Sequence, residues 1–256
     1  MIHPTAIIAD TARIADDVDI GPYSLIGDDV EIGSGCHIGG HVVINGPTRL
    51  GTNNRIYSFA AVGDDPQDKK YAGEPTRLEI GNGNTIREFC TISRGTVQDK
   101  GVTRLGDDNW IMAYVHIAHD CVIGSHTILA NNATLAGHAH LGDWVIMGGF
   151  SGVHQFCRIG DHAFLGMYAG IGQDVPAYTM VSGQPATPRG INSEGLKRRN
   201  FSSEQIRNIK HAYRLLYRQK LKLADAVAQI AKLAEERPEL RPLLNSLQES
   251  GRSIVR

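Results

Sequence analysis

Aliphatic residues recur at every sixth position over most of the chain. Steps of six from Ile2 land on an aliphatic residue as far as Val62, and the pattern resumes over 80–92 and from Leu105 to Ile171. In total, 26 positions follow this rule without a polar exception. A period of six fits neither a helix nor a plain alternating strand. It is typical of a β-helix, in which each hexapeptide forms one short strand and one corner.

The same spacing predicts the cross-section of the coil. Three hexapeptides make one turn, and successive turns stack through parallel strands about 4.8 Å apart. The large aliphatic residue fills the interior, and a small residue two positions earlier lies where the walls converge. We expect the residues at this small position to be buried rather than metal ligands or nucleophiles. They include all four cysteines, Cys36, Cys90, Cys121 and Cys157.

Two interruptions of the period predict loops. The expected positions 68 and 74 hold acidic residues, so a loop is expected near 64–77. After Ile92 the next aliphatic residue of the pattern is Leu105, and the gap between the two is not a multiple of six. A second loop is therefore expected near 93–103. Long excursions from a regular solenoid are usually functional or lie at a subunit contact.

Helical signals replace the sixfold pattern near the end of the chain. Ser202 and Gln205 form a capping box at the start of one helix. Further helices are expected over about 222–236 and 238–250, and they cover the end of the coil. The predicted domains are a β-helix over 1–188 and a C-terminal α-helical domain over 189–256.

Seven of the eleven histidines fall between residues 116 and 162. With three hexapeptides per turn, Ile117, Leu135 and Val153 form one column of the coil. The histidines near this column are expected to line one corner over roughly 10 Å; they are His116, His119, His138 and His154. The histidines on other columns are expected to be solvated surface residues; they are His126, His140 and His162.

His119 stands out because Gly137 follows it by one full turn. A glycine beside a histidine leaves open space and an accessible backbone N–H, as a general base next to an oxyanion donor requires. Asp120 follows His119, and a carboxylate near an imidazole fixes its tautomer and stabilises its protonated form. From the residues alone, a catalytic corner and a zinc site with histidine ligands both stay open.

Composition and charge narrow the class of protein. No apolar run is long enough to cross a bilayer, so no membrane span is predicted. The N-terminus lacks the pattern of a signal peptide and no C-x-x-C pair occurs, which indicates a cytoplasmic protein. Residues 1–188 carry 11 basic and 20 acidic residues, whereas 189–256 carry 15 and 7. The basic end can attract an anionic partner or dock on its own acidic body.

Four segments together resemble one family of enzymes. They are HIAHDC at 116–121, QDKKYAGEPTR at 67–77, RGTVQ at 94–98 and NSEGLKRR at 192–199. Together, and in their order along the chain, they resemble the acyl-[acyl-carrier-protein]–UDP-N-acetylglucosamine O-acyltransferases, hexapeptide-repeat enzymes of lipid A biosynthesis, from end to end. The resemblance implies a left-handed parallel β-helix and a homotrimer with its sites between subunits. It also implies transfer of an R-3-hydroxyacyl group from acyl carrier protein to the glucosamine 3-hydroxyl of UDP-N-acetylglucosamine.

The resemblance assigns roles to individual residues. His119 matches the general base, Asp120 its partner and Gly137 the backbone oxyanion donor. Ser93 replaces a histidine often seen before the Arg-Gly-Thr-Val stretch, and Ser193 replaces an aliphatic residue; neither touches the proposed base. Substrate contacts are implied for Asp68, Lys70, His116, His138, His154, Gln155, Asn192, Glu194, Arg198 and Arg199.

Met167 is expected to limit the length of the acyl chain. It belongs to the column of Asn131 and Gly149, which we expect to lie next to the histidine corner. Related enzymes that use fourteen-carbon donors resemble this sequence but carry glycine there. The distance from His119 along the coil, about 13 Å, suits a chain of about ten carbons.

The resemblance also defines the expected partners and the alternatives. No metal and no permanently bound cofactor is implied, because the acyl donor arrives on the phosphopantetheine of acyl carrier protein. Neither nucleic acid nor a membrane is an expected partner. Two other classes of protein remain as alternatives: a zinc-dependent trimeric β-helix hydratase and a structural solenoid without enzymatic activity.

Overall fold

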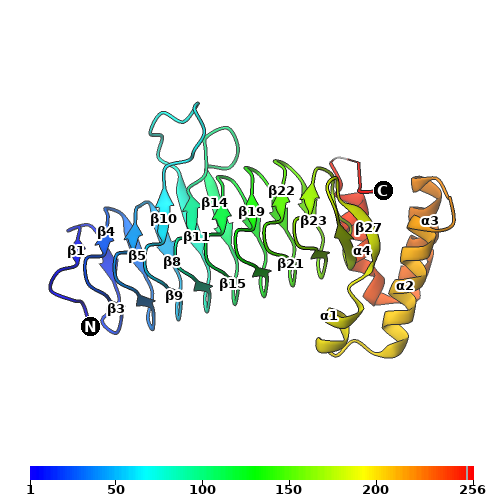
Figure 1. The fold of residues 1–256 in the computed structure, drawn as a ribbon, viewed down its shortest axis with the longest axis horizontal. Helices are drawn as coiled ribbons and strands as arrows, with labels where there is room; N and C mark the ends of the chain where they lie inside the picture. Colours follow the sequence, from blue (N-terminus) through cyan, green and yellow to red (C-terminus); the bar gives the residue numbers. More distant parts are fainter. Residues whose placement is uncertain (252) are drawn as a thin grey trace.

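The computed structural model describes residues 1–251 and 253–256, and most of them wind into one straight parallel β-helix (Figure 1). Its short strands lie on three faces, here called sheets 1, 2 and 3, and each turn visits them in that order. This is the mainly β fold that the sixfold pattern predicts.

The strands divide among the three sheets as follows. Sheet 1 contains β1 (Ile7–Ile8), β4 (Leu25–Ile26), β7 (Val43–Ile44), β10 (Ala61–Asp64), β13 (Thr91–Ser93), β16 (His116–Ile117), β19 (Thr134–Leu135), β22 (Gly152–Val153) and β25 (Gly170–Ile171). Sheet 2 contains β2 (Arg13–Ile14), β5 (Val30–Ile32), β8 (Thr48–Leu50), β11 (Arg77–Ile80), β14 (Val102–Leu105), β17 (Val122–Ile123), β20 (His140–Leu141) and β23 (Arg158–Ile159). Sheet 3 contains β3 (Asp19–Ile20), β6 (His37–Ile38), β9 (Arg55–Ile56), β12 (Thr85–Ile86), β15 (Trp110–Ile111), β18 (Ile128–Leu129), β21 (Ile146–Met147), β24 (Phe164–Leu165), β26 (Thr179–Ser182) and β27 (Thr187–Ile191).

Neighbouring turns pair in parallel with a regular step of three hexapeptides. Thr134 pairs with Gly152, and Leu135 pairs with Val153. Each inward aliphatic side chain therefore stacks on its equivalent one turn away, and from Ile20 to Ile171 none of those on the sixfold pattern is more than 4% exposed. The four cysteines are fully buried in the same core, as predicted.

Two loops replace corners between sheet 1 and sheet 2. Ala61 pairs with Thr91, so the turn between them is longer than a regular turn by two hexapeptides. Leu78 pairs with Thr103, so the next turn is also longer than a regular one, but not by whole hexapeptides. We call the segments loop one (65–76) and loop two (94–101). Both project from the same side of the coil (Figure 1).

The chain leaves the coil through an antiparallel pair of strands, β26 and β27, and then forms helices. β27 runs past residue 188, where we placed the end of the β-helix domain, and the first helix begins at Ser193. The predicted capping box is present at the start of α2, where Ser202 and Gln205 bond reciprocally. The helices are α1 (Ser193–Arg198), α2 (Ser203–Tyr217), α3 (Leu223–Glu236), the 3-10 helix η1 (Pro238–Leu240) and α4 (Arg241–Gln248).

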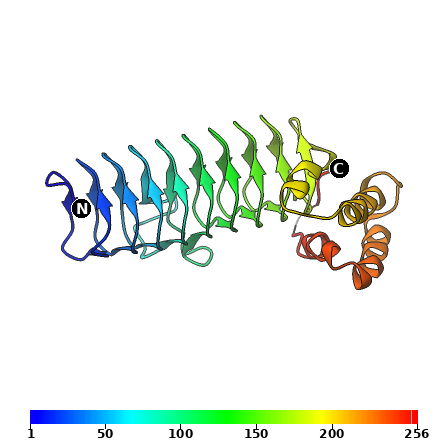
Figure 2. The same cartoon turned by 90° about the horizontal axis from the view of Figure 1, so that it is seen from below.

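The helices gather beyond one end of the coil and form a second apolar core (Figure 2). Tyr178 of the last turn packs with Leu196, Ile209 and Ile230 in this core. The C-terminal segment returns to the coil, where the Val255 N–H donates to the carbonyl of Asp174. None of the described helices is long and apolar enough to cross a membrane.

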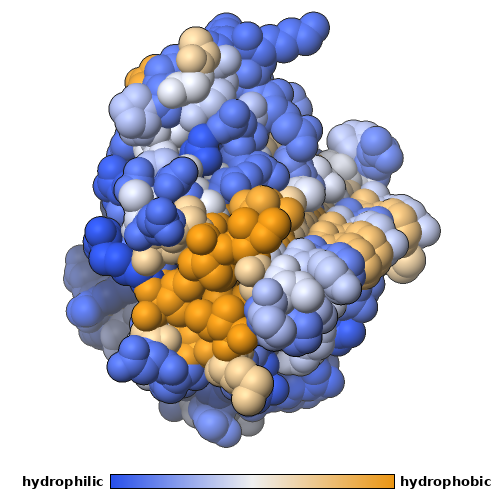
Figure 3. Space-filling view, turned by 90° about the vertical axis from the view of Figure 1, so that its left-hand side faces the viewer, coloured by the Kyte–Doolittle hydropathy of each residue, from blue (hydrophilic) through white to orange (hydrophobic). Residues whose placement is uncertain are grey.

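The opposite end of the coil has no such cover. Figure 3 shows an apolar patch at this N-terminal end, ringed by polar residues. Ile2 and Ile7 are 46% and 66% exposed, and Ile8 and Ile14 are only partly buried. The interior of the β-helix is therefore continuous with the surface at its first turn.

Candidate active site

We number the corners of the coil by the sheets they join. Corner 1 joins sheets 1 and 2, corner 2 joins sheets 2 and 3, and corner 3 joins sheets 3 and 1. His119 follows β16, Gly137 follows β19 and Gln155 follows β22, so all three lie on corner 1 in consecutive turns. Loops one and two leave the coil at the same corner in the preceding turns. The repeat therefore assembles the predicted catalytic residues on one edge.

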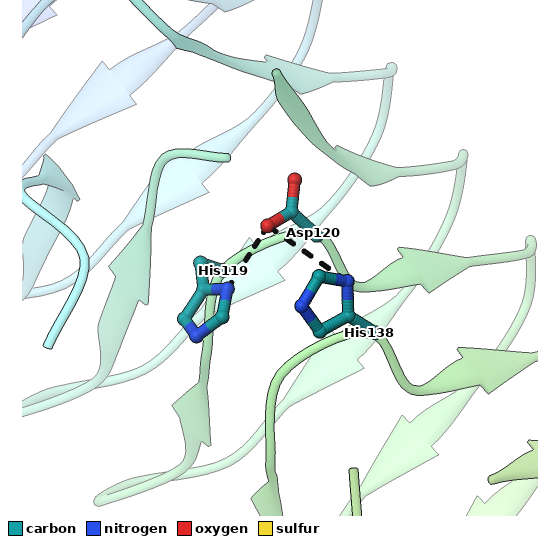
Figure 4. Close-up of side chains that lie close together, drawn as sticks. All are labelled: His119, Asp120 and His138. Carbon is teal, nitrogen blue, oxygen red and sulfur yellow. Dashed lines mark hydrogen bonds and ion pairs between the residues drawn. The ribbon is translucent and has the colours of Figure 1, made fainter. Parts of the chain in front are cut away.

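His119 and Asp120 form a hydrogen-bonded dyad (Figure 4). Nδ1 of His119 lies 2.9 Å from Oδ2 of Asp120, and the Asp120 side chain is 1% exposed. Burial alone would raise the pKa of Asp120, but hydrogen bonds from His119 and Thr96 hold that pKa below its ordinary value. An ionised Asp120 accepts the Nδ1–H of His119 and leaves Nε2 as the proton acceptor.

Two threonines of the second interruption hold Asp120, and the sixfold pattern did not reveal either. The Thr96 hydroxyl donates to Oδ2 of Asp120 over 2.6 Å, and the Thr96 N–H lies 3.0 Å from both carboxylate oxygens. The N–H of Asp120 donates to the Thr103 hydroxyl over 2.8 Å. The only signal that could have located them is their place at the predicted loop near 93–103.

Gly137 leaves room for the imidazole of His119. A Cβ at this position would lie 2.6 Å from Cε1 and 2.7 Å from Nε2 of His119, so a larger residue would displace the ring. Among the described residues, the Gly137 N–H donates no hydrogen bond. The ring that can accept a proton therefore packs on a residue whose own N–H has no partner among the described residues, as a base next to an oxyanion donor requires.

His138 lies beside His119 and approaches the same oxygen of Asp120 (Figure 4). Its Nδ1 is 3.0 Å from Oδ2 of Asp99 in loop two and 3.9 Å from Oδ2 of Asp120. Its ring stacks on Phe156 with centroids 4.4 Å apart. Two carboxylates and an aromatic ring thus fix this imidazole, and Asp99 is a further residue that the period did not reveal.

The other predicted contacts of corner 1 differ in burial. His116 Nδ1 lies 2.7 Å from the Thr91 hydroxyl, and burial, followed by nearby His119, lowers the pKa of His116. His154 and Gln155 are exposed. The chain therefore offers one half-buried imidazole and two exposed polar side chains near the dyad.

The dyad and His138 also form the kind of group that can hold a metal ion. One ligand atom from each of His119, Asp120 and His138 lies within 4.8 Å of the others. Imidazole and carboxylate are common zinc ligands. However, Oδ2 of Asp120 already accepts hydrogen bonds from His119 and from both donors of Thr96.

Loop one carries the two predicted sugar-nucleotide residues on a fixed base. Oδ1 of Asp68 accepts the N–H of Lys70 over 3.0 Å, and the Lys70 side chain is exposed. At the base of the loop, buried Arg94 forms an ion pair with Asp65 and donates to the Tyr71 hydroxyl. Arg94 thus ties loop one to the start of loop two.

The predicted C-terminal residues divide into structural and exposed ones. Asn192 is the N-cap of α1, and its side chain also donates to the carbonyl of His162 over 3.0 Å. Glu194 is exposed and pairs with Lys197. Arg198 is exposed. Of these, Asn192 holds the fold in place, whereas the side chains of Glu194 and Arg198 are exposed at the surface.

Arg199 contacts His162, which corrects one prediction. Nη1 of Arg199 lies 3.0 Å from Nδ1 of His162, and the guanidinium lies over the Trp144 ring. Burial, followed by Arg199, lowers the pKa of His162 to about 4. His162 is therefore a packed neutral residue and not the solvated one that we expected, because Trp144, Tyr178 and α1 cover its column.

We expected Met167 to lie next to the histidine corner, but it does not. It follows β24 on corner 3, whereas His119 lies on corner 1, so the whole width of sheet 1 separates them. Met167 is 59% exposed. The expected position was wrong because the period gives the column of a residue but not which columns share an edge.

One chain thus does not bring all the predicted residues together. Corner 1 holds the dyad, His138, His154 and the two loops, and His116 lies in the strand that leads into it. Arg199 and Asn192 contact residues of corner 2, and Met167 lies on corner 3.

Comparisons with known proteins agree with this architecture. Residues 11–46 and 103–137 match the bacterial transferase hexapeptide family, and residues 174–255 match domain 2 of UDP-N-acetylglucosamine O-acyltransferase. The solved UDP-N-acetylglucosamine O-acyltransferase of Moraxella catarrhalis superposes with a TM-score of 0.98 at 50% identity, over 100% of this chain and 99% of that one. The enzyme of Francisella novicida gives 0.98 at 45% identity, over 100% and 94%.

A curated relative extends the match along the sequence. The acyl-[acyl-carrier-protein]–UDP-N-acetylglucosamine O-acyltransferase of Thiobacillus denitrificans is 60% identical over 255 residues, which cover 100% of this chain and 99% of the relative. The fold is the left-handed parallel β-helix with C-terminal helices that the resemblance implied. The chain therefore belongs to the acyl-[acyl-carrier-protein]–UDP-N-acetylglucosamine O-acyltransferase family.

Proposed function

We propose that the chain transfers an R-3-hydroxyacyl group from acyl carrier protein to the glucosamine 3-hydroxyl of UDP-N-acetylglucosamine, with His119 as the general base. One observation carries the proposal: the imidazole of the His119–Asp120 dyad packs against Gly137, whose N–H donates no hydrogen bond within the described part of the chain. The names of the relatives, which give acyl-[acyl-carrier-protein] and UDP-N-acetylglucosamine but neither the acyl group nor the hydroxyl, support it.

The geometry supports direct transfer. Nε2 of neutral His119 takes the proton of the sugar hydroxyl while the oxygen attacks the thioester carbonyl. The Gly137 N–H donates to the oxyanion that forms. The C–S bond then breaks, and the thiol leaves with the proton that His119 returns. The ester and the free phosphopantetheine thiol balance the starting alcohol and thioester.

The cysteines give no support to an acyl-enzyme. Attack by cysteine requires the thiolate. Burial raises the pKa of Cys121 to about 12 and that of Cys90 to about 11. Both are fully buried in the core. In this proposal the acyl group passes directly from acyl carrier protein to the sugar nucleotide. The thioester that carries it is formed with the phosphopantetheine of the donor.

A homotrimer would complete the site. In one chain, Met167 and Arg198 lie away from corner 1, and the substrate contacts proposed for them need a neighbouring copy. Sheet 2 carries an alternating charged ladder suited to water, in which Glu31 pairs with Arg13 and Arg49. Corner 3 instead exposes stacked aromatic rings, and contiguous exposed apolar surface is typical of subunit contacts. These rings are Tyr23, Phe59, Phe89 and Tyr114, which are 42–63% exposed.

The remaining roles follow from this arrangement. Asp68, Lys70, His116, His138, His154, Gln155, Asn192, Glu194 and Arg199 would bind or frame the sugar nucleotide and the acyl chain. Met167 would close the far end of an acyl groove across the subunit contact, so that a donor of about ten carbons fits best.

The test is incubation of the purified protein with UDP-N-acetylglucosamine and a panel of 3-hydroxyacyl carrier-protein thioesters, followed by mass spectrometry. We expect one acyl group on the sugar and release of the free thiol. Zinc analysis of the same sample addresses the hydratase alternative, which the relatives do not favour. Stoichiometric zinc without acyl transfer would contradict the proposal.

A further inference from the structure

We propose that Thr96 is a positioning residue for catalysis: its hydroxyl holds the Asp120 carboxylate, and through it the imidazole of His119, in the working orientation. The inference rests on the proposed function for its kinetic consequences. Its structural part concerns the dyad alone. Nothing in the sixfold repeat requires a threonine here, because loop two lies outside the repeat.

The first step is the hydrogen-bond pattern of Asp120. Oδ2 is the oxygen that faces His119, and it is also the oxygen that accepts the Thr96 hydroxyl over 2.6 Å. The Thr96 N–H is shared between both oxygens at 3.0 Å. Without the hydroxyl, that shared N–H alone would hold the carboxylate, which could then turn about its Cβ–Cγ bond. The hydroxyl therefore fixes the rotation of the carboxylate at which one of its oxygens meets Nδ1 of His119.

The second step is burial. The Asp120 side chain is 1% exposed and Thr96 is 1% exposed, so water cannot replace the hydroxyl. An ionised carboxylate in such a place depends on the donors that the protein supplies. Removal of the Thr96 hydroxyl destabilises the ionised form of Asp120 and lets its carboxylate rotate. Both changes weaken the hydrogen bond from Nδ1–H of His119 to Asp120.

The third step is the rigidity of Thr96 itself. The preceding Gly95 passes so close to loop two's exit that a Cβ would lie 2.1 Å from the N of Val102. The Gly95 N–H donates to the carbonyl of Arg77 over 3.2 Å, and the Gly101 N–H donates to the carbonyl of Thr96 over 3.0 Å. Thr96 is thus clamped at the base of loop two and can act as a fixed support.

The experiment compares three variants that differ in one feature each. Thr96→Val keeps the shape but loses the hydroxyl, and Thr96→Ser keeps the hydroxyl. Thr127→Val is the matched control, because Thr127 is also buried and donates over 2.6 Å to Asn109 on a different corner. Each is assayed for kcat and for KM toward UDP-N-acetylglucosamine.

We expect Thr96→Val to lower kcat by about 10- to 100-fold with KM little changed, since the loss is one of alignment. Thr96→Ser should stay within about threefold of the wild type. Thr127→Val should lose thermal stability but keep kcat. A Thr96→Val enzyme with normal kcat, or a Thr96→Ser enzyme as slow as Thr96→Val, would overturn the proposal.

A readout without substrate separates this inference from the proposed function. In protein labelled with ¹⁵N-histidine, the His119 signals, identified by their loss in His119→Ala, report the ring tautomer. We expect Thr96→Val to change them and Thr127→Val to leave them unmoved. If the wild type acylates no sugar nucleotide but this change occurs, the proposed function fails and the positioning role stands. Unchanged signals in Thr96→Val would sink the positioning role.

Discussion

At the residue scale, the site depends on the absence of a side chain at Gly137. The missing Cβ of Gly137 leaves room for the His119 ring, and the N–H of the same residue donates no hydrogen bond to any described residue. Asp120 sits at a corner with φ of 57°, in the left-handed region, and points its carboxylate back at the ring. Base, partner and donor thus occupy adjacent turns of one edge.

His119→Ala should lower kcat by about 10²- to 10⁴-fold, the usual effect of losing a general base. His126→Ala is the matched control, because His126 lies on corner 2 and stacks on Trp144. The measurement is steady-state kinetics on both variants, with the melting temperature and the oligomeric mass as checks of folding. Comparable turnover in the two variants would remove His119 from the mechanism.

Met167→Gly should shift the donor preference toward longer acyl chains. Removal of the exposed side chain opens the end of the proposed groove, whereas Met167→Leu retains its bulk and should keep the wild-type profile. Competition among ten-, twelve- and fourteen-carbon donors in one reaction gives the profile directly. A wild type that already prefers fourteen carbons would rule out the proposed role of Met167.

The sequence predicted the residues of the dyad better than the loop-two residues that hold the dyad and His138 in place. The regular step of one turn places His119 and Gly137 on one edge. That Asp120 is the partner of His119 was implied only by the resemblance, because adjacency in sequence does not fix where a side chain points. Thr96 and Asp99 were missed since the extra residues of loop two break that step. His162 was misjudged because residues that are distant in sequence cover it, which no periodicity within the coil reveals.

At the scale of elements, α1 is attached to the coil by polar contacts. Asn192 reaches the carbonyl of His162, and Arg199 reaches both Nδ1 of His162 and the carbonyl of Trp144. Since a guanidinium only donates, Nδ1 of His162 must accept and the ring must be neutral. The predicted helices agree closely with the observed α2 and α3. The sequence did not predict that β27 extends to Ile191, so that α1 begins only at Ser193.

Acid should loosen this attachment. His162 has a pKa of about 4 in the folded chain and an ordinary value of 6.5, so between these values the unfolded chain binds more protons. Stability that is complete above pH 6.5 is therefore lost progressively as the pH falls to about 4. In His162→Gln, which cannot titrate, the drop in melting temperature over this window should be smaller by about 2 °C or more. His126→Gln, with an equal drop to the wild type, is the control.

At the scale of the whole molecule, charge is divided along the axis of the coil. The acidic body has a balance of −9 and the C-terminal part a balance of +8. The helices that carry the excess lie beyond one end, so the two charges are separated in space (Figure 1). Such a separation favours encounter with anionic partners and does not require a specific contact.

Salt should therefore weaken the capture of the donor more than its turnover. Between about 50 and about 500 mM salt we expect kcat/KM for the carrier-protein donor to fall by about tenfold while kcat changes little, because screening acts on encounter. A short pantetheine thioester without the carrier protein is the control and should show a much weaker dependence. An equal response of both donors would show that the charge division has no role in capture.

The regular pairing step also fixes which residues face the interior of the coil, and we call this alternation its phase. A single inserted residue between β16 and β25 would turn every later aliphatic side chain from the interior to the wall, because alternate positions face opposite ways. A whole turn, or a segment that leaves the coil and returns, preserves that alternation, and so does an even change in length such as that in the last turn, where Leu165 pairs with Val181. The extra residues of loops one and two are of the second kind. Variation in length within the coil is thus confined to the edge where the catalytic dyad lies.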